Sequence, residues 1–313
     1  MKFIDLHCDT IDKLISIKED DKLKINSHSV DIEKLIKGNC LAQTFALYVD
    51  IESCKEPYKH CMNMANKFHK EVNLNDDLIS LATNYKEIID NEKRGKISAL
   101  LSIEEGAVLE GDIENLNKFY NLGVRMMTLT WNHENEIGYP HIRSEYSSKG
   151  LKDFGIEVVN KMNELGMIVD VSHLSDAGFY DVAKISKTPF IATHSNARKI
   201  TNHSRNLTDD MIKTLANLGG VTGINFCSAF IGDTPKTMIK DMVNHIKHIR
   251  NIGGIDVIAL GSDFDGIGCE VEIKDASEMG KLAMQLEREG FKTEEIEKVF
   301  YKNALRVIKD VMK

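Results

Sequence analysis

The sequence predicts a single α/β domain over residues 1–313, folded as a (β/α)8 TIM barrel with extra C-terminal helices. Eight short apolar runs recur along the chain, and helix-like segments that often end in glycine separate most of them. The runs are almost continuously apolar, which is typical of parallel strands covered on both faces. This alternation indicates βαβ units, and eight units favour a closed barrel over a doubly wound open sheet.

The expected strands are the apolar runs, each seven to ten residues long. In chain order they are residues 2–8, 40–49, 97–105, 124–131, 167–174, 189–195, 220–226 and 256–264. The first run is unusual because "FIDLHCDT" (3–10) places acids and a histidine among apolar residues. A buried charge is costly unless it is paired or bound to a metal, so this stretch indicates a cation site.

Helix-like segments fill the connections between these strands. Ser175 and Thr208 are expected N-caps, and Gly38, Gly123 and Gly166 are expected to follow helix ends. The segments are residues 30–38, 57–71, 76–94, 113–123, 151–166, 175–186, 208–220 and 235–254. Residues 275–313 add two further helices, which we expect to pack outside the barrel.

The charge balance favours a small-molecule ligand over nucleic acid. The 313 residues include 48 acidic and 40 basic side chains, whereas phosphate binding requires a basic surface. No apolar run approaches the roughly 18 residues of a membrane span, and the first residues lack the apolar segment of a secretory signal. Six cysteines without a C-x-x-C pair are typical of reduced thiols. We therefore expect a cytoplasmic protein with no membrane contact.

Polar residues gather where the expected strands end, which is where barrels of this class carry their chemistry. His7 and Asp9 end the first strand, and residues at i and i+2 of a strand point the same way. Five further strands also end in such residues. They are Glu104 and Glu105, Asn132 and His133, His173, His194, and Asp263 with Asp265.

These residue types suit two divalent cations. His7 and Asp9 can hold one cation, and His173 and His194 offer two neutral imidazoles, which are typical zinc ligands. Glu104, between the two pairs, can bridge cations ~3.5–4 Å apart, as in two-metal hydrolases. Cations there would neutralise the acids of the first strand.

The last expected strand adds another acid to this centre. Asp263 in "GSDFDG" (261–266) lies where a carboxylate can accept a proton from a metal-activated water. The alternative is that Asp263 or Asp265 caps a turn. We favour the catalytic role for Asp263.

Seven motifs resemble those of the membrane dipeptidase (renal dipeptidase) family of binuclear zinc peptidases, within the amidohydrolase-like barrel superfamily. They follow the family's order and spacing over nearly the whole chain, and together they are highly specific. The motifs are DLHCD (5–9), SIEEG (102–106), RMMTLTWN (125–132), VDVSH (169–173), ATHSNAR (192–198), NHSRNLTDD (202–210) and GSDFDG (261–266).

The resemblance implies two zinc ions per subunit. His7 and Asp9 would bind one ion, His173 and His194 the other, and Glu104 would bridge them. Other divalent metals are alternatives, because such mixed ligand sets also suit manganese, iron or cobalt. The family also implies a homodimer.

The resemblance assigns further roles to three residues. Arg205 would grip the terminal carboxylate of a dipeptide, which a guanidinium can do through two parallel hydrogen bonds. Asp263 would take the proton. Glu105 would lie outside the ligand set, in a second layer or in solvent.

Strand four departs from the pattern of the animal members. By the resemblance, those members carry a histidine directly after "TLT", which would polarise the scissile carbonyl or stabilise the tetrahedral intermediate. Here that position is Trp131. His133 lies two residues on, on the same face if the strand continues, and is a candidate replacement. Trp131 becomes a candidate substrate-binding residue.

The sequence hypothesis is a cytosolic, metal-dependent dipeptidase in which a hydroxide bridging two zinc ions attacks the peptide carbonyl. Dipeptides with a C-terminal D-residue are among the expected substrates. The first alternative is another metal hydrolase on this scaffold, such as a lactonase, phosphotriesterase or deaminase. A non-catalytic metal-binding or peptide-binding protein is the second alternative.

Overall fold

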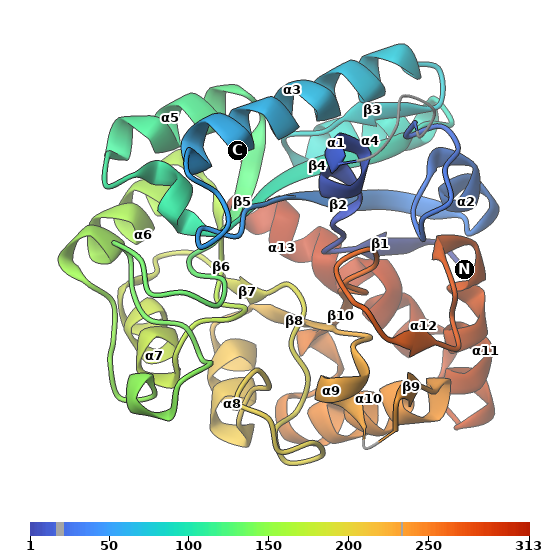
Figure 1. Cartoon of the computed structure of the whole chain (residues 1–313). Coiled ribbons are helices and arrows are strands. Elements are labelled where there is room, and N and C mark those ends of the chain that lie inside the picture. Colours follow the sequence, from blue (N-terminus) through green and yellow to red (C-terminus); the bar gives the residue numbers. More distant parts are fainter. Residues whose placement is uncertain (17–21, 233) are drawn as a thin grey trace.

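A computed structural model describes residues 1–16, 22–232 and 234–313 as a closed barrel of eight parallel strands (Figure 1). Each strand pairs with the next around the ring, and the last, β10, pairs with β1. The strands are β1 (Phe3–Asp5), β2 (Cys40–Tyr48), β4 (Ile97–Glu104), β5 (Val124–Thr128), β6 (Ile168–Asp170), β7 (Ile191–Ala192), β8 (Val221–Ile224) and β10 (Ile258–Leu260). The predicted (β/α)8 barrel is confirmed.

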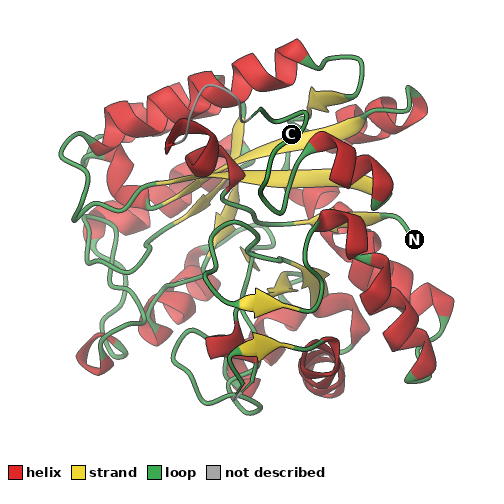
Figure 2. Cartoon of the chain, turned by 45° about the vertical axis from the view of Figure 1, so that its right-hand side comes forward, coloured by secondary structure: helices red, strands yellow, loops and turns green. Residues whose placement is uncertain are grey.

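Helices surround the strands, as expected of βαβ units (Figure 2). The predicted caps form, because the side chain of Ser175 accepts from the Gly178 amide and that of Thr208 from the Met211 amide. The helices are α1 (Thr10–Ser16), α2 (Ile32–Lys37), α3 (Pro57–Leu74), α4 (Tyr85–Lys93), α5 (Ile113–Asn121), α6 (Asp153–Leu165), α7 (Asp176–Ile185), α8 (Asp209–Asn217), α9 (Ser228–Ile231) and α10 (Ile239–Gly253).

Residues 76–94, predicted as one helix, instead contain a strand and a shorter helix. β3 (Ile79–Leu81) pairs in parallel with the start of β4, where Ile79 faces Ile97. β5 pairs with the same edge of β4 only from Leu101 onward, so it leaves the first residues of β4 unpaired on that side. β3 covers that edge, and α4 follows it.

The apolar core has two layers because neighbouring strand residues point to opposite faces. Phe3 and Leu101 belong to the outer layer between strands and helices. Ile4 and Leu100 belong to the inner layer, within the barrel. All four of these side chains are fully buried, so both faces of the strands are apolar, which accounts for the continuous apolar runs in the sequence.

The C-terminal helices differ from the expectation that they lie outside the barrel. α11 (Gly280–Arg288) and α12 (Thr293–Glu297) lead into α13 (Asn303–Val311), drawn in red behind the strands in Figure 1. Val307 and Ile308 of α13 pack in the inner layer with Ile4. The amide of Asn303 donates to the carbonyls of Ile255 and Ile258. α13 therefore closes the N-terminal end of the barrel, opposite the polar rim.

A small second sheet joins two of the loops that follow the barrel strands. β9 (Lys236–Thr237) pairs in parallel with β11 (Glu270–Val271), which connects the loops that follow β8 and β10. Among the helices within the described ranges, none has both the length and the apolar character needed to cross a bilayer.

Candidate metal centre and substrate cavity

The five predicted ligands converge at the C-terminal ends of the strands. His7 Nε2 lies 3.4 Å from an Asp9 carboxylate oxygen and 3.2 Å from Glu104 Oε2. The other oxygen, Glu104 Oε1, lies 3.1 Å from His173 Nε2 and 3.4 Å from His194 Nε2. Each carboxylate oxygen of Glu104 thus faces one of the two predicted ligand pairs. Within each resulting group of three residues, the candidate ligand atoms lie within 4.8 Å of one another.

The imidazoles of His173 and His194 are oriented so that their Nε2 atoms, which carry no proton, face each other. His194 Nδ1 lies 2.7 Å from Thr193 Oγ1, and that hydroxyl donates to Asp170, so the imidazole must donate at Nδ1. His173 Nδ1 lies 3.1 Å from the Asn132 side-chain oxygen, which can only accept. Both Nε2 atoms therefore carry lone pairs, and they lie only 3.1 Å apart. Metal-binding histidines are held in this way, with the second nitrogen fixed by a hydrogen bond.

Unsatisfied buried atoms also fit a cation. Among the described residues, His7 Nε2 and Asp9 Oδ1 are buried without a hydrogen-bond partner. Glu104 and Asp263 add two more buried carboxyl groups to the same space. Burying several acids together is costly unless a positive charge compensates them. The donor set of carboxylates and imidazoles suits zinc and related divalent ions.

Electrostatic shifts in the metal-free centre reflect this crowding. Burial opposes protonation of His7, but the carboxylates of Glu104 and Asp9 outweigh it and raise the pKa of His7. Burial alone would raise the pKa of Glu104, yet the positive charge of His7 holds it well below its ordinary value. A cation would take the place of the His7 proton.

Asp5, the first acid of the opening stretch, is satisfied differently from the prediction. Its carboxylate accepts from the Ser262 amide at 2.8 Å, the Ser262 hydroxyl at 2.6 Å and the Gln43 amide at 3.1 Å. Burial raises the pKa of Asp5, and these hydrogen bonds oppose that shift. Asp5 therefore links β1 to its neighbours, and of the two acids in this stretch that were expected at the metal centre only Asp9 belongs to it.

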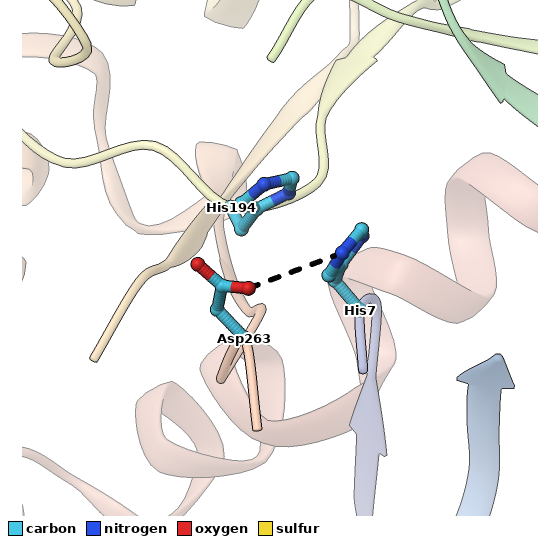
Figure 3. Close-up of side chains that lie close together, drawn as sticks. All are labelled: His7, His194 and Asp263. Carbon is cyan, nitrogen blue, oxygen red and sulfur yellow. Dashed lines mark ion pairs between the residues drawn. The ribbon is translucent and has the colours of Figure 1, made fainter. Parts of the chain in front are cut away.

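Asp263 lies beside the centre, as Figure 3 shows. Its Oδ1 is 4.0 Å from His7 Nε2, and its Oδ2 accepts from the Asn225 amide at 2.9 Å. Burial raises the pKa of Asp263 to about 8, so this carboxyl group can hold a proton near neutral pH. Its backbone has φ of 62°, a left-handed conformation that is uncommon outside glycine.

A cavity of about 380 Å³ is lined by three of the five candidate ligands, Asp9, Glu104 and His173. This volume is in the range of small-molecule sites. The loop carrying Gly266 passes so close that a Cβ at this position would lie 2.1 Å from Asp9 Oδ2, which requires glycine. The lining residues are Asp9, Asp12, Lys13, Tyr48, Glu104, Trp131, Asn132, His173, Cys227, Phe230, Asp263, Gly266, Ile267 and Gly268.

Arg205 has free hydrogen-bonding capacity although it is buried. Its Nη1 donates to the Ser195 hydroxyl at 2.6 Å, whereas Nε and Nη2 have no partner among the described residues. The guanidinium lies 5.9 Å from the Phe230 ring, which lines the cavity. Burial lowers the pKa of Arg205, and the charge of Asp263 opposes that shift. Such a group is suited to an incoming carboxylate.

Trp131 and His133, the two candidate residues that follow β5, lie in different surroundings in the structure. The Trp131 ring lines the cavity and packs edge-on against Tyr48 at 4.9 Å. The imidazole nitrogens of His133 lie 3.2 Å from acids of the β2–α3 loop, Asp50 and Glu52. His133 is not among the cavity-lining residues because the strand ends at Thr128 and the chain turns away. The structure does not bring His133 to the ligands.

Glu105 is a buried positioning residue. Its carboxylate accepts from the amides of Ala107 and Trp131 and from the Asn135 side chain. It therefore fixes the start of the loop that carries Trp131 into the cavity. Burial raises the pKa of Glu105 to about 7.

Some site residues had no motif in the sequence. Tyr48 ends β2, so the same strand-end rule predicts its place, although a tyrosine is not a metal ligand of this class. His141 comes from the loop after β5, and its ring lies 5.8 Å from that of His173. Cys227 and Phe230 follow β8. Loops gave no periodic signal that could place the last three residues.

A closed parallel barrel with acids and imidazoles converging at its C-terminal rim defines a metal-dependent hydrolase of the barrel class. Within that class, the chain belongs to the membrane dipeptidase family, peptidase family M19, whose family model matches residues 1–313. It is thus a metallopeptidase of a family that hydrolyses dipeptides.

Two of the curated relatives are named as dipeptidases, and a third has no function in its name. An uncharacterized dipeptidase of Schizosaccharomyces pombe is 31% identical over 305 residues, which cover 91% of this chain and 72% of the relative. Dipeptidase tcpJ of Claviceps purpurea is 29% identical, with 90% and 69% covered. An uncharacterized protein of Klebsiella pneumoniae is 36% identical over 237 residues, with 71% and 86% covered.

Solved structures share the fold. A dipeptidase AC described as an M19 metallopeptidase superposes with a TM-score of 0.92 at 23% identity, covering 100% of this chain and 99% of that one. A metallopeptidase of Rhodobacter sphaeroides has a TM-score of 0.90 at 22% identity, with 99% of each chain covered. That protein was crystallised with a phosphinate mimic of the dipeptide L-Ala-D-Ala.

Proposed function

We propose that this chain hydrolyses dipeptides at a centre holding two zinc ions. His7 and Asp9 would hold one ion, His173 and His194 the other, and Glu104 would contact both. The observation that carries this proposal is the position of the Glu104 carboxylate. One of its oxygens faces His7, and the other faces His173 and His194. The three imidazoles and two acids match the ligand types that zinc prefers.

The metal ions, when bound, would supply a water of lowered pKa and polarise the scissile carbonyl. Asp263 would accept the proton of that water and return it to the leaving amine. The Asn225 amide orients this carboxylate. Trp131 and Tyr48 would cover the cavity on one side and exclude bulk water.

Arg205 would fix the substrate by its terminal carboxylate. The two unpartnered nitrogens of Arg205 and its burial support this role. The Arg205 guanidinium would select substrates by length, because a longer peptide would place its terminal carboxylate out of reach. The ligand of the Rhodobacter sphaeroides neighbour supports small dipeptides with a C-terminal D-residue as substrates.

The test is hydrolysis of a dipeptide panel by purified protein with zinc. The panel contains L-L and L-D pairs, matched tripeptides, and a lactone and a phosphotriester as controls for the other hydrolase classes. We expect chelator-sensitive release of amino acids from dipeptides alone. Turnover of a control ester with no turnover of any dipeptide would overturn the proposal.

We also propose that the protein is a cytoplasmic homodimer. All six cysteines are free thiols in the structure, which supports a reducing compartment. Light scattering coupled to size-exclusion chromatography measures the subunit number, and a monomeric mass for the active protein would contradict the dimer.

A further inference from the structure

Two cysteines from different loops meet at the wall of the cavity. Cys227 precedes α9 and lines the cavity, and Cys269 directly precedes β11. The amide of Ser228 donates to Cys269 Sγ at 3.2 Å, which holds this sulfur against the Cys227 backbone. Cys269 Sγ also lies 3.9 Å from the Phe226 carbonyl oxygen, one residue before Cys227. Neither loop is a predicted ligand segment, and the proposed hydrolysis does not use either thiol.

The surroundings shift the pKa values of these two thiols in opposite directions. The neighbouring Cys227 thiol and the hydrogen bond from the Ser228 amide lower the pKa of Cys269, although partial burial opposes them. The same thiol pair raises the pKa of Cys227. The thiolate is the reactive form of cysteine, so Cys269 is the expected site of attack. Cys8, Cys40 and Cys61 differ because burial raises their pKa.

We propose that Cys227 and Cys269 form an oxidative modification site for hydroperoxides. The Cys269 sulfur attacks the peroxide O–O bond and becomes a sulfenic acid, with hydrogen peroxide reduced to one water. The Cys227 thiol then attacks that sulfur, the S–O bond breaks, and the hydroxyl leaves as a second water. The product is a disulfide, and two thiol hydrogens have been consumed.

The disulfide would act on the proton-accepting acid. The Cys227 amide donates to the Asn225 side chain at 2.6 Å, and Asn225 donates to Asp263 at 2.9 Å. Drawing Cys227 onto Cys269 would shift this chain of contacts and the cavity wall. The consequence, which rests on the proposed function, is a reversible loss of kcat with little change in KM.

The test begins with thiol mapping of the holoenzyme, which needs no assay of turnover. The protein is treated with hydrogen peroxide, free thiols are blocked with N-ethylmaleimide, and peptides are mapped without reduction. We expect a Cys227–Cys269 cross-link that dithiothreitol removes, while Cys54, a partly exposed cysteine, stays blockable. Both thiols remaining blockable under peroxide that oxidises Cys54 would overturn the proposal.

Variants separate the two steps. Cys227→Ser should leave Cys269 as a sulfenic acid that dimedone traps, and Cys269→Ser should leave Cys227 unoxidised. Oxidation of Cys227 in the Cys269→Ser protein would overturn the assigned order. If a variant fails to fold, the wild-type map still decides. Dipeptide turnover is measured separately, and full turnover in the cross-linked enzyme would overturn the coupling to Asp263.

Discussion

Removing the Arg205 side chain tests how the site measures substrate length. Arg205 is 3% exposed, and its Nη1 already donates to the Ser195 hydroxyl. Two guanidinium nitrogens are left without partners among the described residues, and these are the donors that a substrate carboxylate would satisfy. Arg205→Ala removes both donors and the charge, while the five candidate metal ligands stay in place.

The expected magnitude follows from those two donors. A hydrogen bond to a charged group contributes about 1.5–3 kcal/mol, so two contribute about 3–6 kcal/mol. Each 1.36 kcal/mol corresponds to a factor of ten, which gives a fall in kcat/KM of roughly 10²–10⁴-fold. The loss should fall on substrates with a free terminal carboxylate.

The assay compares a dipeptide with its C-terminal amide in the same enzyme preparation. Wild type should prefer the free acid by roughly 10²–10⁴-fold, because only the acid satisfies the guanidinium. Arg205→Ala should reduce this preference to near unity. The ratio does not depend on the fraction of folded enzyme, so a partial loss of stability does not change it.

Arg125 is a matched control. It is also buried, but its donors bond to the carbonyls of Thr83, Tyr120 and Val124 at the start of β5, the opposite end of the barrel. Arg125→Ala should lower stability and keep the acid-to-amide ratio. An unchanged ratio in Arg205→Ala would refute the role of Arg205.

Four further perturbations test the centre and the fold. Chelation should lower the melting temperature by calorimetry as well as turnover, because ligand at 100 times its Kd adds about 2.7 kcal/mol of stability. Asp170→Asn should weaken zinc retention about 10–100-fold in a competition with a chromogenic chelator, because Asp170 fixes the hydroxyl that orients an imidazole. His245 is buried with its pKa lowered to about 4, mainly by burial. The unfolded chain binds a proton below pH 6.5 and the folded one does not, so stability falls by about 3 kcal/mol from pH 6.5 to 4. Urea unfolding of the metal-free protein should show this fall in the free energy of unfolding between pH 6.5 and 4. In His245→Gln, the contribution of His245 to the fall should be absent. Ile308→Ala, at the closed end of the barrel, should cost about 2–5 kcal/mol by urea unfolding and leave kcat/KM unchanged.

Strand positions were predictable because the barrel buries both faces of each strand. The runs at 97–105 and 124–131 correspond to β4 and β5, and the inner and outer core layers explain why both faces are apolar. β3 was not predictable, because a three-residue strand on a local free edge leaves no period in the sequence. α13 reads as an ordinary amphipathic helix, and nothing in its sequence says that its apolar side faces the barrel end.

The positions of the candidate metal ligands were predictable because strand ends of a parallel barrel share one rim. His7, Glu104 and His194 follow from that rule alone. The resemblance was needed for Arg205, which lies in a loop without periodicity. His133 illustrates the limit of the rule, because it assumes that the strand continues to residue 133, whereas β5 ends at Thr128.

Backbone conformation explains why the strand-end rule works for some residues after their strands have ended. β6 ends at Asp170, yet His173 reaches Glu104 because its φ is 66°, in the left-handed region. Asp263 has φ of 62° two residues beyond Gly261. Such conformations in non-glycine residues cost of order 1–3 kcal/mol and persist only where the surroundings impose them. For His173, the imposed contacts include its carbonyl, which accepts from the His141 amide at 2.8 Å. The turn that directs His173 inward is therefore fixed by a loop more than thirty residues earlier, which no local pattern around residue 173 encodes.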